Sequence, residues 1–517
     1  MKKRWLITML LVTLLSVALL LAGCQSKNGT DGESAKDVGT QEQKEVEEEK
    51  AETEKKEETE EISLKFLHNS DSFDPETDYT RELIKELLNV DIIPEMGNED
   101  DKVNLILNSG QEYDMIKLTN RNLLISYMEN GIIHPLNEYI DKYPDLKNAF
   151  TQDEWDMVSF DGQIYAIPET NTNDVEWGFA IRKDWLDALG EDIPQTIDDF
   201  YRVLKRFKEE DPGNVGKENV VPLTMEGKII FNGLSQAFGV SAEVGGYIEK
   251  DGELLPSMEL EGTRELITFL NKLYKEGLLD ADYPSNKNET MISKIAAGYA
   301  GACRMTPWES AAVRTIKESN PDAELVFMEP FKDADGNRSI ENRSGLKGFL
   351  IVPKSSDKAE EVVKYCNDFL AKENYEKLIV GEEGVSFQME DGKYMPILPE
   401  FDKFNKGRWF YPTNVGERYT ELFSARAHKE KEMGELWDDI NEKCGQYSYD
   451  PVLNYAPTLD NEIEAVKQSL KEWTKEKVIK MIIDEKELEN FDSYVAEWKE
   501  KGGDRLTEAY NEWYQNR

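Results

Sequence analysis

The stretch Ile62-Ser63-Leu64-Lys65-Phe66-Leu67 opens a series of short apolar runs that alternate with helical patterns. An amphipathic stretch at 80–88 follows it, then a second apolar run at 90–94, a helical pattern at 100–107 and a third strand-like run at 113–118. Strands that alternate with helices in this way predict a parallel sheet flanked by helices. We therefore expect an α/β fold.

Polar side chains follow the first and third of these runs. Asn69, Ser70 and Asp71 follow the first, and Thr119 and Asn120 follow the third. In open α/β sheets ligands bind at the carboxyl ends of the strands. These residues are therefore candidates for the rim of a ligand cleft, and ordinary turn residues of the same types are the alternative interpretation.

A second alternating region begins near Val175. A strand-like run at 177–181 leads into a helical pattern at 183–190. The next helix is expected to end near Glu209, and the Thr196 hydroxyl suits its N-cap. The later predictions are a helix at 262–276, strands at 297–303, 325–327 and 349–352, and a charged, helix-rich tail at 461–517.

The size and charge of the chain limit its partners. It has 517 residues, 39% of them hydrophobic, which is enough for a large core in two lobes or domains. Its formal net charge of -42 repels nucleic acid phosphates and anionic lipid surfaces. Nucleic acid is therefore excluded as a partner, and we expect a monomer.

The N-terminus has the pattern of a secretory signal. Three basic residues at 2–4 precede an apolar run at 5–21, and Leu21-Ala22-Gly23-Cys24 follows. This resembles the lipobox of bacterial lipoproteins, which implies a signal peptide at 1–23 and a lipidated Cys24. An uncleaved membrane anchor is the alternative, and both place the rest of the chain at the extracellular face of the cell membrane.

Two further features concern the tether and the cysteines. Residues 24–61 are polar and rich in glutamate, so they predict an extended acidic tether. Cys303, Cys366 and Cys444 fit neither a zinc ribbon nor a disulfide-rich scaffold. We interpret them as buried thiols, and their spacing leaves one disulfide among them open.

Several segments together resemble the extracellular solute-binding proteins of carbohydrate-uptake ABC importers. The resemblance is to the lipoprotein LipO-like branch, which is similar to alginate-oligosaccharide receptors. The matching segments are EYDMI at 112–116, GIIHPL at 131–136, DGQIYAIP at 161–168, IRKDWL at 181–186, GEEGV at 381–385 and FDSYV at 491–495. Their order and spacing carry the resemblance, because no single motif is decisive.

The resemblance implies a periplasmic-binding-protein type II fold, with two α/β lobes and a cleft between them. We expect the first lobe at 62–174 and about 304–355, and the second at 175–303 and about 356–517. The implied function is the capture of a small polar solute, expected to be an oligosaccharide, by hinge closure. Delivery to ABC permease subunits in the membrane follows from the same resemblance.

Sugar sites combine aromatic faces with planar polar side chains. Trp308 follows a small-residue strand where, in the resembled family, the chain returns to the first lobe and carries a stacking tryptophan. Arg304 lies in the same segment. Trp177 and Glu176 precede a strand at the opposite wall. These four are candidate ligand-binding residues, and a core or surface role is the alternative for the tryptophans.

Weaker candidates lie in two other segments. By resemblance, the segment that contains Glu226 and Asn232 lines the second lobe. Trp409 and Tyr411 form an aromatic cluster that could close over a sugar, although a structural role is the favoured interpretation for the tryptophan.

Alginate-type relatives carry a calcium loop after the helix that corresponds to 196–209. Here Gly213 and Val215 stand where oxygen ligands are needed, which leaves Asp211 and Asn219 as the obvious side-chain ligands. A plain turn is therefore the favoured interpretation, and we expect no metal and no cofactor.

Common catalytic motifs are missing from the sequence. Its three histidines are His68, His134 and His428, and it has no H-E-x-x-H, G-x-S-x-G, P-loop or G-x-G-x-x-G pattern. We expect no enzyme activity. A lipid-anchored glycoside hydrolase that uses two of the 104 acidic residues is the leading alternative, followed by a surface lipoprotein with no transport role.

Overall fold

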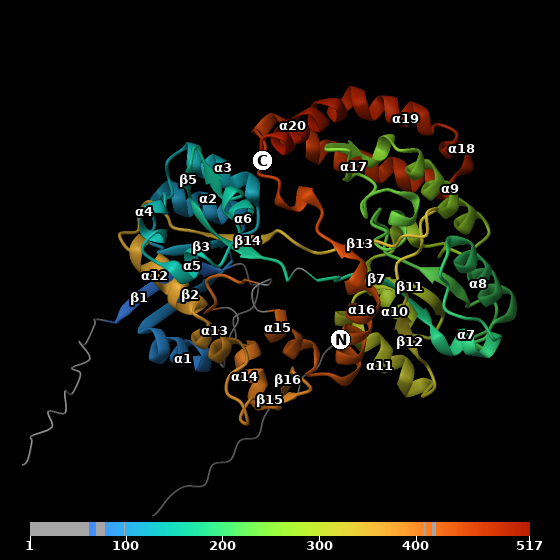
Figure 1. Ribbon diagram of the computed structural model, residues 1–517, viewed down its shortest axis with the longest axis horizontal. Coiled ribbons are helices and arrows are strands. Elements are labelled where there is room, and N and C mark those ends of the chain that lie inside the picture. The colour runs from blue at the N-terminus through green and yellow to red at the C-terminus, as the bar shows by residue number, and fades with distance from the viewer. Residues whose placement is uncertain (1–60, 69–77, 98, 173, 407–409, 416–419) are drawn as a thin grey trace, which may run out of the picture. The chain divides into compact units, whose positions relative to one another are not determined.

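The first sheet has five strands in the order β2-β1-β3-β14-β6 (Figure 1). The strands are β1 (Ile62–His68), β2 (Val90–Met96), β3 (Met115–Leu118), β6 (Ala166–Thr170) and β14 (Leu346–Ile351). β1 is parallel to β2 and β3, whereas β14 is antiparallel to β3 and β6. This sheet confirms the α/β order predicted from the sequence.

The computed structural model describes residues 61–68, 78–97, 99–172, 174–406, 410–415 and 420–517. The segments predicted as signal peptide and tether, including Cys24, lie almost entirely outside these residues. No helix in the described part of the chain is both apolar enough and long enough to cross a membrane.

The helices and hairpins of the first lobe pack around its sheet and share one apolar core. The helices are α1 (Asp78–Leu88), α2 (Asp100–Ser109), α3 (Arg121–Glu129), α4 (Asn137–Ile140), α5 (Pro144–Lys147), α6 (Gln152–Asp156), α12 (Ala359–Leu370), α13 (Lys372–Ile379), α14 (Glu400–Lys406) and α15 (Thr420–Ala427). The hairpins are β4 (Ser159–Phe160) with β5 (Gln163–Ile164), and β15 (Phe387–Glu390) with β16 (Lys393–Pro396).

The second sheet has four strands in the order β12-β7-β11-β8. They are β7 (Gly178–Arg182), β8 (Val221–Thr224), β11 (Ala300–Met305) and β12 (Leu325–Phe327). Two smaller pairings accompany it: β9 (Tyr247–Lys250) with β10 (Glu253–Pro256), and β13 (Ile340–Glu341) with β17 (Ser448–Tyr449). β11 is antiparallel to β7 and parallel to β8.

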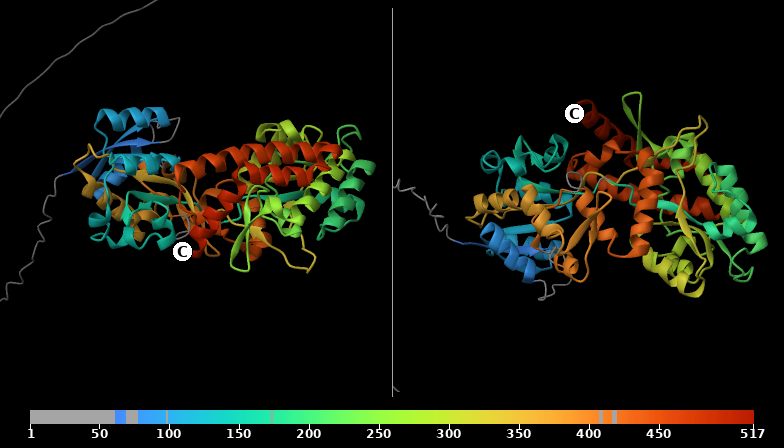
Figure 2. Two further views of the ribbon diagram at one scale, coloured as in Figure 1. Left: turned by 90° about the horizontal axis from the view of Figure 1, so that it is seen from above. Right: turned by 60° about the horizontal axis from the view of Figure 1, so that its bottom comes forward.

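The helices of the second lobe include the whole C-terminal tail, drawn in red in Figures 1 and 2. They are α7 (Lys183–Leu189), α8 (Ile197–Glu210), α9 (Glu261–Lys275), α10 (Asn288–Ala296), α11 (Ser310–Ser319), α16 (Lys431–Cys444), α17 (Asn461–Ile483), α18 (Glu485–Leu488), α19 (Phe491–Trp498) and α20 (Asp504–Gln515). The predicted N-cap of α8 is confirmed, because the Thr196 hydroxyl accepts a hydrogen bond from the Asp199 amide at 3.2 Å. α17 contacts both α9 and α20.

The chain crosses between the lobes in the segment between β6 and β7, of which 171–172 and 174–177 are described, and at 342–345, before β14. These two crossings are hydrogen-bonded to each other. The Asn171 amide donates to the Gly345 carbonyl at 2.9 Å, and the Arg343 amide donates to the Asp174 carbonyl at 2.9 Å. A further crossing joins α15, in the first core, to α16, in the second lobe.

The lobe boundaries differ from those expected. Residues 325–327 were assigned to the first lobe, but β12 pairs with β7 in the second sheet. Residues 359–427 were assigned to the second lobe, but apolar residues of α12 and α13 belong to the first core. The reason is that β11 and β12 bracket β7 in one sheet, so the chain returns to the first lobe only at β14.

The three cysteines of the body are buried free thiols: Cys303, Cys366 and Cys444. The disulfide left open by their spacing is therefore not formed. Each thiol lies in an apolar core, as expected for a small hydrophobic residue.

Candidate functional site

A pocket of about 380 Å³ lies where the two crossing segments meet. Its lining comes from both lobes and from the crossings. The lining residues are Asn171, Glu176, Trp177, Ile230, Asn232, Ala242, Arg304, Glu341, Asn342, Arg343, Ser344, Leu346 and Asn454. This volume lies within the range of small-molecule pockets.

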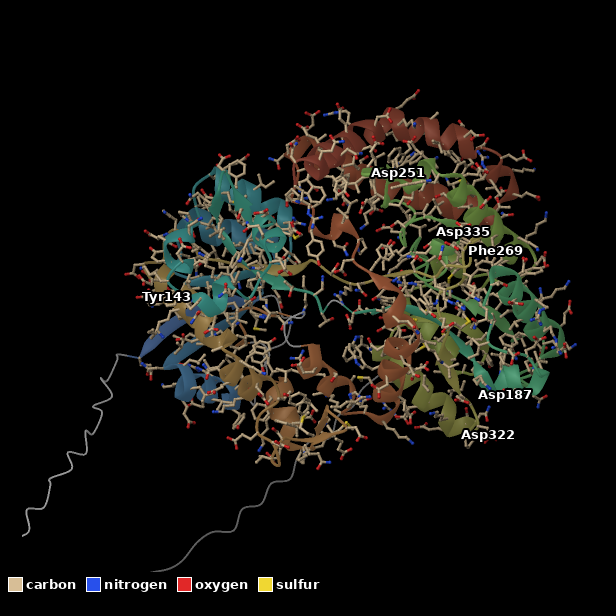
Figure 3. The ribbon with its side chains drawn as sticks, in the orientation of Figure 1. Tyr143, Asp187, Asp251, Phe269, Asp322 and Asp335 are labelled. Atoms are coloured by element: carbon tan, nitrogen blue, oxygen red, sulfur yellow. The ribbon has the colours of Figure 1, made fainter. Side chains whose placement is uncertain are left out.

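Another pocket, of about 490 Å³, lies between α11, β12 and α16, and Asp322 at its edge is labelled in Figure 3. Its lining has no aromatic side chain and comes from the second lobe alone. The crossing pocket is the better site, because a ligand there touches both lobes and the segments that join them.

Two strands bring Trp177 and Arg304 together. Trp177 directly precedes β7, and Arg304 lies on β11, where it pairs with Phe179 of β7. The Arg304 guanidinium lies 4.2 Å from the centre of the Trp177 ring. Trp177 is half-buried, so this pair gives the pocket an aromatic wall backed by a cation.

Arg304 is a buried cation among carboxylates. Its side chain is 6% exposed, and its Nη1 lies 3.6 Å from Glu226 Oε2. Its Nε has no hydrogen-bond partner. Burial lowers the pKa of Arg304 to about 10, and Glu226 opposes that shift. Arg304 therefore remains charged at neutral pH.

The carboxylates around this pocket are held by cations. Glu176 pairs with Arg343 and accepts a hydrogen bond from Trp177 Nε1 at 3.0 Å. Glu226 accepts from Lys228 Nζ at 2.8 Å. Trp177, Glu176, Arg304, Asn232 and Glu226 were all candidates from the sequence, and the structure brings the first four into the pocket lining and Glu226 into contact with Arg304.

Asn232 is fixed by the strand β13. Its Nδ2 donates to the Glu341 carbonyl, and its Oδ1 accepts from the Glu341 amide, both at 2.8 Å. The Glu341 carboxylate accepts from the Ala242 amide at 2.8 Å and the Tyr449 hydroxyl at 3.1 Å. Burial raises the pKa of Glu341. The pocket floor is thus already organised by hydrogen bonds.

Sequence reasoning missed Asn171, Asn454 and the run Glu341-Asn342-Arg343-Ser344. The run carried a usable signal, because four polar residues stand between the apolar residue Ile340 and the start of β14. Asn454 is far away in sequence and reaches the site through its hydrogen bond to Ser344 Oγ at 2.9 Å. No local pattern marks it.

Trp308 lies outside the lining of the crossing pocket. It is 42% exposed and lies 5.5 Å, between ring centres, from Trp437 on α16. The chain after β11 stays in the second lobe, so the position expected at the return to the first lobe is not reached there. Its role as a ligand residue remains a prediction.

The remaining candidates fall elsewhere. Tyr411 is 5% exposed in the first core, and its ring centre lies 5.1 Å from that of Phe369. Thr119 is exposed after β3 and does not line the pocket. Asn120 caps α3 by accepting a hydrogen bond from the Asn122 amide at 3.1 Å. The candidates outside the described residues are Asn69, Ser70, Asp71 and Trp409.

The loop after α8 is closed by hydrogen bonds from its own main-chain amides to a carboxylate. The Asp211 carboxylate accepts hydrogen bonds from the amides of Val215 at 3.0 Å and Gly216 at 2.9 Å. Gly213 packs so closely on Trp185 that a side chain there would overlap the indole ring. In the described part of the chain no group of three His, Cys, Asp or Glu side chains is placed to hold a metal ion.

Comparisons with known proteins agree with this architecture. The family described as "Bacterial extracellular solute-binding protein" matches residues 79–375. Lipoprotein LipO of Bacillus subtilis is 27% identical over 437 residues, which cover 80% of this chain and 84% of LipO. The polygalacturonan/rhamnogalacturonan-binding protein YtcQ of the same species is 23% identical over 99% of both chains.

A solved structure shows the same fold. The Streptococcus pneumoniae ABC-transporter substrate-binding protein FusA, in complex with kestose, superposes with a TM-score of 0.67 at 19% identity. The match covers 88% of this chain and 99% of FusA. The two-lobe fold expected from the resemblance is therefore confirmed, and the chain belongs to the family of bacterial extracellular solute-binding proteins.

Proposed function

We propose that this chain captures an oligosaccharide between its two lobes and delivers it to an ABC importer. The observation that carries the proposal is the crossing pocket, in which the Trp177 ring stands beside Arg304, Asn232 and two carboxylates. Aromatic faces suit the C–H faces of sugars, and planar polar groups suit their hydroxyls. Names of the relatives support the solute class, because YtcQ and FusA are named for saccharides.

Hinge closure is the mechanism that the connections favour. The pocket wall includes Leu346 of the first lobe and Arg304 of the second, together with Asn171 and Trp177 of the crossing segment between them. A ligand that contacts both lobes stabilises the closed state more than the open state. Hydrogen bonds hold the two crossing segments together, so the segments suit the role of a hinge.

Attachment to the membrane through Cys24 is part of the proposal. It rests on the lipobox-like Leu21-Ala22-Gly23-Cys24 and on the likeness to lipoprotein LipO. The acidic tether would hold the body away from the lipid surface. No bond of the solute is broken in this cycle.

Thermal unfolding with a panel of mono- and oligosaccharides tests the function. We expect at least one oligosaccharide to raise the melting temperature in a concentration-dependent way, because a ligand that binds only the folded state stabilises it. The sugar must be recovered unchanged. Release of shorter products would instead favour a glycoside hydrolase, and stabilisation by no sugar would contradict the proposal.

The variant W177A is expected to bind the stabilising sugar about tenfold more weakly, a loss of about 1.4 kcal/mol, because the aromatic wall is removed. Isothermal titration calorimetry measures the change. Trp308→Ala is the matched control, because that indole is more exposed and lies outside the lining. If W308A loses affinity and W177A does not, the ligand site lies near α16 instead.

A pocket next to the crossing pocket, called the second pocket below, supports a ligand longer than one sugar. It has a volume of about 330 Å³ and shares Glu341 and Asn454 with the crossing pocket. Tyr247, Tyr510 and Trp498 contribute to its lining. A chain of sugars could therefore continue from one pocket to the other past these two shared residues.

A large side chain introduced at Gly245 would fill this second pocket. It lines the pocket, and a Cβ there would meet only the Thr474 methyl, at 3.7 Å. We expect G245W to weaken binding of a tetrasaccharide about tenfold and to leave a disaccharide unchanged. Gly445→Trp is the control, because Gly445 also has open space but lines neither pocket. Equal losses for both sugar lengths would contradict a second binding region.

A further inference from the structure

The charged groups of the crossing pocket cancel one another. Among the described residues, its lining holds two carboxylates, those of Glu176 and Glu341, and two cations, Arg304 and Arg343. The formal charges therefore sum to zero inside a chain whose overall charge is -42.

The cations in and around the pocket already interact with carboxylates of the chain. Arg343 pairs with Glu176, and Lys228 pairs with Glu226 at 2.8 Å. Arg304 lies 3.6 Å from Glu226 and stacks on Trp177 at 4.2 Å. A carboxylate of a ligand next to Arg304 would stand close to Glu226 and would meet repulsion from that like charge. The pocket thus offers no excess positive charge for an anion.

A hydroxyl group suits this arrangement better than a carboxylate does. A hydroxyl both donates and accepts hydrogen bonds, whereas an ionised carboxylate only accepts them. Arg304 supplies donors in the lining of the pocket, and Glu176 and Glu341 of the same lining supply acceptors. A neutral sugar can accept from Arg304 and donate to a glutamate at the same time.

The second pocket has the same balance. Its charged lining residues are Glu243, Glu341, Lys467 and Lys471. Lys467 also lies 3.3 Å from Glu464. Neither pocket therefore compensates a ligand that carries one negative charge on each sugar.

We propose that the site selects neutral oligosaccharides and rejects oligouronates, even though one relative is named for polygalacturonan. This inference rests on the proposed function and narrows its substrate class. The repulsion comes from Glu226, which holds Arg304 from one side, and from the unbalanced acidity of the whole chain.

The test separates charge from shape. Titration calorimetry of the full chain compares trigalacturonate with its fully methyl-esterified form, and kestose and maltotriose serve as neutral sugars of equal length. We expect at least one neutral sugar to bind, and the methyl ester to bind at least about tenfold more tightly than the acid. Tighter binding of the acid than of its ester and of both neutral sugars would overturn the inference. Binding of no sugar of either charge would instead contradict the proposed function.

The variant E226Q tests the preference for neutral sugars independently. It removes one negative charge beside Arg304, so we expect the affinity for trigalacturonate to rise several-fold relative to the ester. E191Q is the matched control, because Glu191 also bridges two cations, Arg202 and Arg206, but lies outside both pockets. An unchanged ratio of acid to ester in E226Q would show that Glu226 does not set the charge preference. Circular dichroism of both variants confirms that they remain folded.

Discussion

Replacing Lys117 with methionine is expected to lower the free energy of unfolding by about 3–5 kcal/mol, because it leaves a buried carboxylate without its nearer, buried cation. Lys117 Nζ lies 3.0 Å from Glu169 Oε1, and both side chains are 6% exposed. The pair spans β14, which separates β3 from β6. Gly348 of β14 leaves room for it, since a Cβ there would lie 3.1 Å from Glu169 Oε2.

The charge state of Glu169 explains the size of the effect. Burial alone would raise the pKa of this carboxyl, but Lys117 and then Lys347 outweigh burial and hold the pKa below its ordinary value. A carboxyl with a lowered pKa stabilises the fold at neutral pH, and this stabilisation is lost as the pH falls. The deficit of K117M should therefore shrink in acid, where Glu169 takes up a proton.

Urea unfolding at neutral pH measures the loss. The double variant K117M/E169Q should recover most of it, because no unpaired charge remains. Lys347→Met is the control on the same carboxylate: that lysine lies 3.6 Å away and is 51% exposed, so we expect a loss of less than about 1 kcal/mol. A K117M protein as stable as the parent would mean that water reaches Glu169.

The elements with clear periodicity were predictable from the sequence, and the lobe assignment was not. The strands β1, β7 and β14 and the helix α8 lie close to their expected positions, because local patterns of apolar residues set them. The partner of a strand depends on contacts distant in sequence. For this reason β12 was placed in the wrong lobe.

The residues of the candidate site also differ in how far the sequence could indicate them. Trp177 and Arg304 could be named as candidates because each lies in or beside a strand that the sequence marks, and the pairing of β7 with β11 brings them together. Tyr411 lies buried in the first core, and the sequence could not show this, because an aromatic residue in a core has the same sequence signal as one that contacts a sugar. Asn454 joins the site only through η8 (Val452–Tyr455), which folds back against the crossing segments.

The contact between η8 and the crossing segment at 342–345 predicts a second large effect, at Gly345. Its φ is +72°, and an added Cβ would overlap the carbonyl oxygen of Asn454. For G345A we expect a loss of about 2–5 kcal/mol in the free energy of unfolding, from left-handed backbone strain of about 1–2 kcal/mol and overpacking of about 1–3 kcal/mol. Urea unfolding again provides the measurement.

Gly336→Ala separates the two contributions. Gly336 also has a positive φ, +86°, but nothing lies within 4 Å of its added Cβ, so only the backbone strain applies. G345A should also weaken sugar binding, whereas G336A should not. The reason is that Asn454, displaced from Ser344, would leave the wall shared by both pockets. If both variants lose equal stability and keep full affinity, the close approach at Gly345 does not hold the crossing segments in the conformation that binds the ligand.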